Sequence, residues 1–236
     1  MKISICTQIK NRLIQFEKTF IKNLEIIEKN TDVEWVIIDY GSTDGLGKYV
    51  KNYVEKYNFI KYYAAVECLQ KYSIPVAKNF AARLSSGDFL FNLDCDNFLD
   101  NIIDEIRATD QGVFCDEYLK GTYGRIGLHK NIFVKIGGYD ENFYPAAVHD
   151  NDLILRAKYL NYDFKNIPNV SAAIPNDKLD TIRYLENISY EKMKEYNEII
   201  MKYNEKKKII NPNNNIFTPC YFVLNFKDYV KKTNMF

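Results

Sequence analysis

A regular alternation of short apolar runs with amphipathic stretches constrains the fold of this chain more than any other feature. Between the runs, apolar side chains recur at spacings of three and four, as in Leu13, Phe16 and Phe20, which is the period of a helix. The runs cover residues 2–7, 34–39, 59–66 and 88–93. They are almost continuously apolar, which is typical of strands buried on both faces. Strands that alternate with helices predict an α/β fold with a Rossmann-like, mostly parallel sheet flanked by helices.

The composition excludes some classes of partner and location. A chain of 236 residues can form one large domain with a full core. Its formal net charge of +1 gives no electrostatic reason to expect a nucleic acid as partner. The 5 cysteines are scattered without a CxxC pair, which suits a reducing cytoplasm better than a disulfide framework. The sequence shows no signal peptide and no apolar run of the roughly 20 residues that a membrane span requires. A cytoplasmic location is therefore expected, with peripheral membrane contact left open.

Acidic residues follow two of the expected strands. Asp39 ends the run at 34–39 and leads into a Gly-Ser-Thr-Asp turn, and the run at 88–93 leads into Asp94 and Asp96. In open sheets of this kind, ligands bind beyond the carboxyl ends of the strands. Side chains at i and i+2 of an extended segment project to the same side, so Asp94 and Asp96 can share a hard divalent cation. A solvated acidic turn remains the alternative.

Four motifs follow one another in the order IIDYGSTDG, IPVAKNFAARLSSGDFLFNLDCDN, GRIGLHKNIFVKIGGYDENF and HDNDLILRA, over roughly residues 2–160. Together they resemble the motifs of glycosyltransferases with the GT-A fold, of the family 2 group and its galactosyltransferase-like relatives of the bacterial capsule and surface-polysaccharide type. The resemblance implies a GT-A catalytic domain over 1–177, followed by a helical C-terminal extension over 178–236. Within the domain it implies a nucleotide-binding half at 1–100 and an acceptor-binding half at 101–177.

The first motif resembles the nucleotide-binding turn of this family, and the resemblance assigns Asp39, Gly41 and Ser42 to nucleotide binding. A carboxylate at a strand end can accept a hydrogen bond from the N3–H of a uracil ring. Gly41 permits the tight turn, Ser42 offers a hydroxyl, and Asp44 is expected to cap the following helix. The alternative is a strand-to-helix turn with a helix cap and no ligand.

The second motif matches the family's positions around the diphosphate. Lys78 and Asn79 correspond to residues close to the nucleotide, and Arg83 is a similar candidate, although a solvated helix surface would account for all three. Asp94 and Asp96 match the DxD motif of the family. The resemblance makes both of them ligands of Mn²⁺ or Mg²⁺, with Asp94 also contacting the donor.

The third and fourth motifs resemble the acceptor side of the site. Tyr139 would stack on a sugar ring, with Asp140 beside it, and Asp150 matches the family's catalytic base. A base at this position would take the proton from an acceptor hydroxyl. Asp150 is also explained as a first-turn helix residue that the helix dipole favours.

Two departures from the family pattern concern the acceptor and the metal. His149 stands where the family usually has Glu, and it is expected to contact the acceptor. Relatives commonly supply a later His as a further metal ligand, and the corresponding stretch NIPNVSAAIPND has none. Asn176 and Asp177 are the candidate replacements.

The resemblance implies a metal-dependent, inverting glycosyltransferase that moves a sugar from a nucleotide donor, expected to be a UDP-sugar, to a hydroxyl of a glycan or glycolipid. Two alternatives stay open. A non-catalytic nucleotide- or glycan-binding protein would keep the fold without turnover. A sugar nucleotidyltransferase would need a Gly-rich, basic phosphate loop near the N-terminus, which CTQIKNRLIQ does not resemble.

Overall fold

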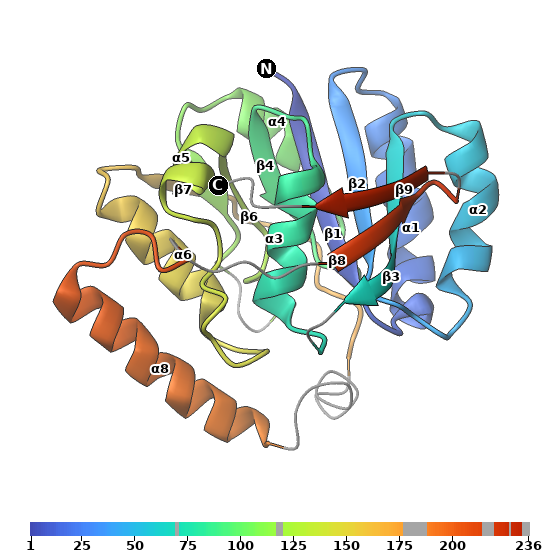
Figure 1. Cartoon of the computed structure of the whole chain (residues 1–236). Helices are drawn as coiled ribbons and strands as arrows, with labels where there is room; N and C mark the ends of the chain where they lie inside the picture. The colour runs from blue at the N-terminus through green and yellow to red at the C-terminus, as the bar shows by residue number, and fades with distance from the viewer. Residues whose placement is uncertain (69–70, 117–119, 177–187, 214–219, 227, 233–236) are drawn as a thin grey trace.

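The computed structural model describes residues 1–68, 71–116, 120–176, 188–213, 220–226 and 228–232 (Figure 1). Its described strands form a sheet of 9 strands in the order β7-β5-β6-β4-β1-β2-β3-β8-β9. The strands are β1 (Ile3–Ile9), β2 (Val33–Asp39), β3 (Ile60–Cys68), β4 (Phe89–Asn92), β5 (Gly112–Phe114), β6 (Ile126–His129), β7 (Phe164–Asn166), β8 (Cys220–Leu224) and β9 (Asp228–Lys232). The helices are α1 (Leu13–Glu28), α2 (Leu46–Lys56), α3 (Ile74–Leu84), α4 (Ile102–Arg107), α5 (Lys130–Lys135), α6 (His149–Lys158) and α8 (Tyr190–Lys207).

The central strands β4, β1, β2 and β3 run parallel to one another. Helices lie on both faces of this part of the sheet, as Figure 1 shows, which confirms the predicted α/β architecture. Outside it, β6 and β8 pair antiparallel with β4 and β3. β1 pairs with β2 as far as Ile9 opposite Asp39, and Asn92 at the end of β4 lies opposite Cys6 of β1. Because parallel strands end at the same edge, the loops after β1, β2 and β4 meet there.

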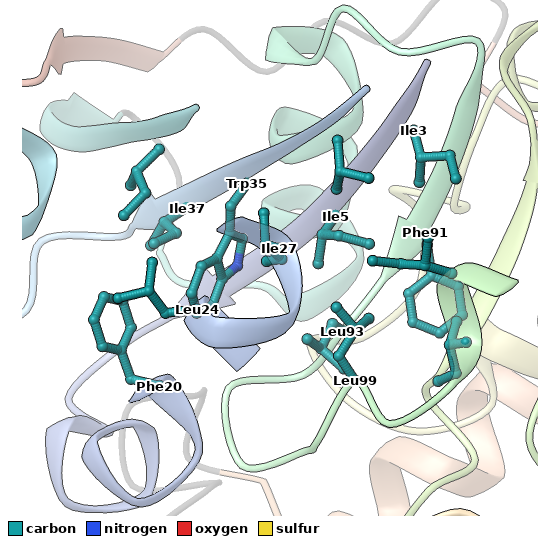
Figure 2. Close-up of a cluster of buried hydrophobic side chains, with 14 of the residues drawn as sticks. Ile3, Ile5, Phe20, Leu24, Ile27, Trp35, Ile37, Phe91, Leu93 and Leu99 are labelled. Atoms are coloured by element: carbon teal, nitrogen blue, oxygen red, sulfur yellow. The ribbon is translucent and has the colours of Figure 1, made fainter. Parts of the chain in front are cut away.

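Apolar layers on the two faces of the sheet fix the helices that border this edge. On one face, Phe20 of α1 stacks on Trp35 of β2 with ring centroids 5.0 Å apart (Figure 2). On the other face, Phe80 of α3 meets Phe222 of β8 with centroids 5.1 Å apart. Burying one side chain of this size contributes roughly 1.5–3 kcal/mol. The two layers therefore hold α1 and α3 firmly against the sheet.

The C-terminal extension is only partly helical. α8 confirms the predicted helix, but β8 and β9 form an antiparallel pair that joins the sheet at β3. This corrects the expectation of a helical segment over 178–236. Without β8, β3 would leave a row of unpaired N–H and C=O groups at the sheet edge. The expected domain boundary at 177/178 falls outside the described residues.

The cysteines meet the expectation only in part. Cys6, Cys95 and Cys115 carry free thiols. Cys220 is disulfide-bonded, which the scattered spacing did not predict. The backbone of Cys68 lies opposite Cys220 in the pairing of β3 with β8. Spacing along the chain cannot reveal such a bond, because the pairing of distant strands decides which residues meet.

Candidate functional site

The turn after β2 is organised around Asp39, which is 4% exposed. Its Oδ1 accepts a hydrogen bond from the Ser42 backbone N–H at 2.6 Å, and its Oδ2 accepts one from the Tyr62 hydroxyl. Burial and the neighbouring Asp39 charge raise the pKa of Tyr62 above its usual range, so the phenol stays a donor. Gly41 has φ +72°, a left-handed conformation that favours glycine. A ligand that reaches Asp39 would share these oxygens with donors already in place.

The loop after β1 is tied to this turn. Asn11 Oδ1 accepts a hydrogen bond from the Thr43 backbone N–H at 2.6 Å. The Asp44 carboxylate accepts from the backbone N–H groups of Leu13 at 2.8 Å and Leu46 at 3.3 Å, the first residues of α1 and α2. The N-cap residue of α2 is Gly45 and not Asp44, but the Asp44 carboxylate binds the first N–H group of both helices. The two loops therefore form one rigid rim at the carboxyl edge of the sheet.

Asp94 follows β4 and is held by two amide donors and one ion pair. Its Oδ1 accepts from Gln8 Nε2 at 2.9 Å and from Asn92 Nδ2 at 3.0 Å, and Lys78 Nζ lies 3.8 Å from the same oxygen. Burial disfavours the charged form, but Lys78 and the two amides outweigh it and hold the pKa of Asp94 below its usual range. Asp94 is therefore a fixed, charged carboxylate, and its side chain is 30% exposed.

The second oxygen of Asp94, Oδ2, lies against Gly124. A Cβ atom at position 124 would lie 2.2 Å from this oxygen, much closer than atoms can approach. We expect Gly124→Ala to displace the carboxylate. The Mn²⁺-dependent binding of UDP that the sequence predicts should then weaken about tenfold, which corresponds to about 1.4 kcal/mol. Calorimetric titration measures the affinity, and a thermal melt checks that the variant is folded. A folded variant with wild-type affinity would contradict the assigned role of Asp94.

The groups around the Asp96 carboxylate stabilise its negative charge only weakly. Burial and the Asp94 charge raise the pKa of Asp96 to about 6. Its Oδ1 accepts from Asn97 Nδ2 at 2.6 Å, and its Oδ2 accepts from Asn176 Nδ2 at 3.3 Å. Asn176, one of the two candidate replacements for the late His, thus reaches the acidic pair. The other candidate, Asp177, lies outside the described residues.

The raised pKa of Asp96 has a consequence for stability without metal. The unfolded chain releases this proton near the ordinary pKa of 3.8, whereas the folded protein keeps it until about pH 6. Stability is therefore lost as the pH rises through this window. We expect Asp96→Asn to stabilise the metal-free protein at pH 7.5 by about 1–3 kcal/mol and to change little near pH 4. Denaturant unfolding in a chelator at both pH values measures this, and an equal effect at the two values would refute it.

The donor atoms around Asp94 and Asp96 fit a hard divalent cation. Carboxylate and amide oxygens are ligands of the kind that Mn²⁺ and Mg²⁺ take, and Asn176 stands beside the pair. A cation would also relieve the surplus negative charge that raises the pKa of Asp96. Arg12 donates to the Asn176 oxygen, so this amide would have to turn to ligate. In the described part of the chain, no group of three or more His, Cys, Asp or Glu side chains could hold a metal, so ligand or water oxygens would complete the shell.

Lys78 joins the acidic pair to Asp150 and Tyr139, which the sequence assigns to the acceptor side. Its Nζ lies 2.8 Å from Asp150 Oδ1, 3.8 Å from Asp94 Oδ1 and 5.1 Å from the centre of the Tyr139 ring. Burial alone would lower the pKa of Lys78, but the carboxylates of Asp150 and Asp94 raise it, so the amine stays charged. Its side chain is 1% exposed, so a solvated helix surface does not describe this residue.

Asp150 lies in the first turn of α6, where the helix dipole favours a carboxylate. Its Oδ1 pairs with Lys78, and its Oδ2 lies 3.3 Å from His149 Nε2. Burial lowers the pKa of His149, which keeps the imidazole neutral near neutral pH. His149 Nδ1 is buried and has no hydrogen-bond partner among the described residues. The Asp150 side chain is 15% exposed, so a small hydroxyl group can approach it.

Three predicted binding residues, Asn79, Tyr139 and Asp140, lie inside the fold and do not line an open surface. Asn79 exchanges two hydrogen bonds of 2.8 Å with the Tyr139 backbone. Asp140 accepts from Asn204 Nδ2 at 2.8 Å. The Tyr139 ring is 2% exposed and packs edge-on against His149, so it offers no free face for a sugar. These residues support the segment around residues 139–140 from within the fold.

Arg83, the remaining basic candidate on α3, also serves the fold. It pairs with Glu141 at 2.6 Å, and both side chains are nearly completely buried. Asn79 donates to the same Glu141 oxygen at 2.8 Å. Of the candidates on α3, Lys78 therefore reaches the predicted base Asp150 and the predicted metal ligand Asp94, whereas Asn79 and Arg83 anchor the segment that follows α5.

Sequence reasoning missed the polar residues that hold the acidic pair from behind. Gln8 donates to Asp94, and Asn97 accepts from Arg125 Nε at 2.6 Å. Gln8 could have been found, because β1 pairs in parallel with the strand before Asp94 and the two ends must be neighbours. Arg125 carried no such signal, since its buried contact with Asn97 depends on the antiparallel return of β6 beside β4.

Solved structures share this arrangement of elements. A mannosyltransferase, PcManGT, from Pyrobaculum calidifontis matches with a TM-score of 0.59 and 17% identity, over 77% of this chain and 59% of its own length. Residues 1–349 of S. aureus TarS match with a TM-score of 0.57 and 15% identity, over 91% of this chain and 74% of that one. A Drosophila β1,4-galactosyltransferase 7 mutant matches with a TM-score of 0.54 and 11% identity, over 81% of this chain and 77% of that one. At these identities the likeness establishes the GT-A fold.

The sequence itself also matches a known family. No curated protein matches the chain. The family model described as glycosyl transferase family 2 matches residues 4–145, which is more than half of the 236 residues. The matched region includes the turn after β2, the helix that carries Lys78, and the acidic pair. This chain therefore belongs to glycosyl transferase family 2.

Proposed function

We propose that this chain is a metal-dependent, inverting glycosyltransferase that moves a sugar from a UDP-sugar to a hydroxyl group of a glycan or glycolipid. The observation that carries the proposal is the position of Lys78, whose Nζ lies 2.8 Å from Asp150 and 3.8 Å from Asp94. This contact sets the expected base beside the expected diphosphate site. The acceptor hydroxyl at Asp150 and the donor diphosphate at Asp94 would then lie on either side of the buried Lys78 amine.

Asp150 is the group that would accept the proton of the acceptor hydroxyl as its oxygen attacks the anomeric carbon. The bond between that carbon and the donor diphosphate breaks, and the diphosphate keeps the electron pair. Attack from the side opposite the leaving group inverts the configuration at the anomeric carbon. Lys78 keeps Asp150 oriented, and His149, buried and neutral, borders it on the other side.

Asp94 and Asp96 are the residues that would hold Mn²⁺ or Mg²⁺, with Asn176 beside them. Such an ion supplies Lewis-acid stabilisation of the charge that develops on a departing diphosphate. Gln8 and Asn92 fix the Asp94 carboxylate in place before any ligand arrives. This preorganisation spares the site a reordering step during the reaction.

The donor assignment rests on the turn after β2 and on what similar structures hold. The TarS structure contains UDP. The galactosyltransferase structure contains manganese and UDP-Gal, and the PcManGT structure contains GDP-Man and Mn²⁺. These complexes support a nucleotide-sugar donor and a divalent cation for this chain as well. Uridine is favoured because Asp39 at the strand end can accept the N3–H of the uracil ring.

The outer face of α8 supports contact with a membrane that carries the acceptor. Tyr196, Ile199 and Tyr203 are 41%, 57% and 56% exposed and follow one side of the helix. Lysines border this stripe by the helical repeat, namely Lys192, Lys202, Lys206 and Lys207. None of the described helices is long and apolar enough to cross a membrane.

We propose that this face rests on an anionic lipid surface. Flotation with vesicles that contain phosphatidylglycerol should carry the protein, and Ile199→Glu should abolish this. Equal flotation of the variant would contradict the contact.

The transfer reaction is tested with UDP-Glc, UDP-Gal, UDP-GlcNAc and GDP-Man as donors, octyl glycosides as acceptors, and Mn²⁺. Proton NMR identifies the product and its anomeric configuration. We expect UDP release coupled to a glycoside of configuration opposite to that of the donor. A product that retains the configuration would contradict direct displacement by a hydroxyl activated at Asp150. Nucleotide binding without any product would favour a non-catalytic binding protein.

A further inference from the structure

The turn just before α6 has an unusual backbone. Ala147 and Val148 have φ +72° and φ +67°, two consecutive non-glycine residues in the left-handed region. For a β-branched residue such as Val148 this conformation is a genuine outlier, and it is held against backbone strain. The His149 backbone N–H donates to the Ala147 carbonyl at 2.8 Å, which closes the turn tightly. Such a turn persists only where its surroundings determine it.

One side chain of α8 holds this turn from outside. Asn197 Nδ2 donates to the backbone carbonyls of Tyr144 at 3.1 Å, Ala146 at 2.8 Å and Ala147 at 2.9 Å. Its Oδ1 accepts from the Tyr144 backbone N–H at 2.7 Å. Asn197 is 0% exposed, so loss of its amide would take one partner from each of these backbone groups, and within the described residues only the Ala147 carbonyl would keep its bond from the His149 N–H. No other residue type offers two N–H donors and an acceptor at this distance from the backbone.

Apolar contacts bring α8 to the same place. Met193, one turn before Asn197, is 0% exposed and forms a small cluster with Ala146. The ring of Tyr196 stacks on that of Tyr144 with centroids 5.0 Å apart and planes 28° apart. The helix is thus seated on residues 144–147, and the Asn197 amide is fixed in register with their backbone.

We infer that Asn197 is a positioning residue that sets the orientation of Asp150 by holding the strained turn at Ala147 and Val148. Asp150 is the second residue of α6 and follows Val148 by two positions, and its carboxylate must meet Lys78 at 2.8 Å. If Ala147 and Val148 relaxed toward ordinary φ values, the first helical turn of α6 would change its direction. The C-terminal helix would then be part of the machinery that places the base. The inference builds on the proposed function for its effect on turnover, but its effect on structure does not depend on it.

A matched control lies on the same helix. Asn204 is buried as well, and its Nδ2 donates to Asp140 at 2.8 Å. Asn204→Ala removes an amide from α8 without removing the contacts of Asn197 to the turn. A general weakening of α8 should therefore appear in both variants, whereas a displaced turn should appear only in Asn197→Ala.

The test uses histidine-labelled protein, because the chain has only 2 histidines and each gives its own imidazole signal. His149 begins α6 and faces Asp150 on its own helix, Lys78 of α3, Asp94 after β4 and the Tyr139 ring. The other, His129, contacts Tyr162 and serves as an internal reference. We expect Asn197→Ala to move the signals of His149 and to raise its pKa toward about 6.5, with His129 unchanged. In Asn204→Ala both histidines should keep their wild-type signals.

Turnover gives the second readout. In the transfer assay, Asn197→Ala should lower kcat about tenfold or more, with the donor KM changed less than threefold, and Asn204→Ala should keep kcat within threefold of wild type. If Asn197→Ala does not fold, Asn197→Ser takes its place, because a hydroxyl adds no buried charge but cannot donate to several carbonyls at once. Unchanged His149 signals in a folded Asn197 variant would overturn the inference. A wild type without turnover would instead count against the proposed function, and the NMR readout would still decide the role of Asn197.

Discussion

Asp150→Asn is expected to lower kcat of the transfer reaction about 10²–10⁴-fold, with little change in the KM for the donor. An amide keeps the size of the side chain and can still accept a hydrogen bond from Lys78, but it cannot take up a proton at neutral pH. Loss of a general base costs a factor of this size. Steady-state kinetics with the donor and acceptor found in the NMR assay measure both constants.

Asp152→Asn is the matched control for this prediction. It makes the same change two residues further along α6, where the Asp152 carboxylate is buried and pairs with Arg156 at 2.6 Å. This variant should melt at a lower temperature and keep kcat within a few-fold of wild type. Equal loss of kcat in the two variants would indicate damage to α6 as a whole and would contradict the assignment of Asp150 as the base.

Lys78→Met is expected to destabilise the protein by about 3–5 kcal/mol. Removing the amine leaves the carboxylates of Asp94 and Asp150 facing each other without their shared cation, and breaking a buried ion pair on one side has a cost of this size. The same loss should make Asp94 easier to protonate and so weaken its binding of a cation, because Lys78 is one of the groups that lower the pKa of Asp94. Denaturant unfolding measures the stability change.

Lys51→Met provides the comparison on an exposed helix position of α2. The side chain changes in the same way, but no buried charge is left behind, so the free energy of unfolding should change by less than about 0.5 kcal/mol. If Lys78→Met cost no more than Lys51→Met, Lys78 would not be the charge that balances Asp94 and Asp150.

The central sheet and the acidic pair could be predicted from the sequence because both depend on local pattern. Apolar runs defined the parallel strands, and the rule that ligands bind at their carboxyl ends singled out Asp39, Asp94 and Asp96. The rest depended on contacts between distant residues. The family resemblance implies that Tyr139 and Asp140 contact the acceptor, but Asn204 and other polar side chains far along the chain cover this segment.

Long-range pairing also explains the misjudged residues on α3 and at the C-terminus. The helical period could not distinguish Lys78, which meets two carboxylates, from Asn79 and Arg83, which anchor backbone and Glu141. In the sequence, β8 is a short apolar run after a polar linker. Its pairing with β3 at the edge of the parallel strands is a long-range contact that the run itself does not indicate. The role of such a residue depends on how deeply it is buried and on which residue it contacts. A single sequence shows neither.

The most direct test of a metal-dependent nucleotide site is calorimetric binding of UDP, with and without Mn²⁺, to the wild type and to Asp96→Ala. We expect the wild type to bind UDP much more tightly with Mn²⁺ than without it, and we expect Asp96→Ala to lose that gain while remaining folded. UDP binding that is indifferent to both Mn²⁺ and the substitution would contradict the metal role of Asp94 and Asp96, and with it the proposed mechanism.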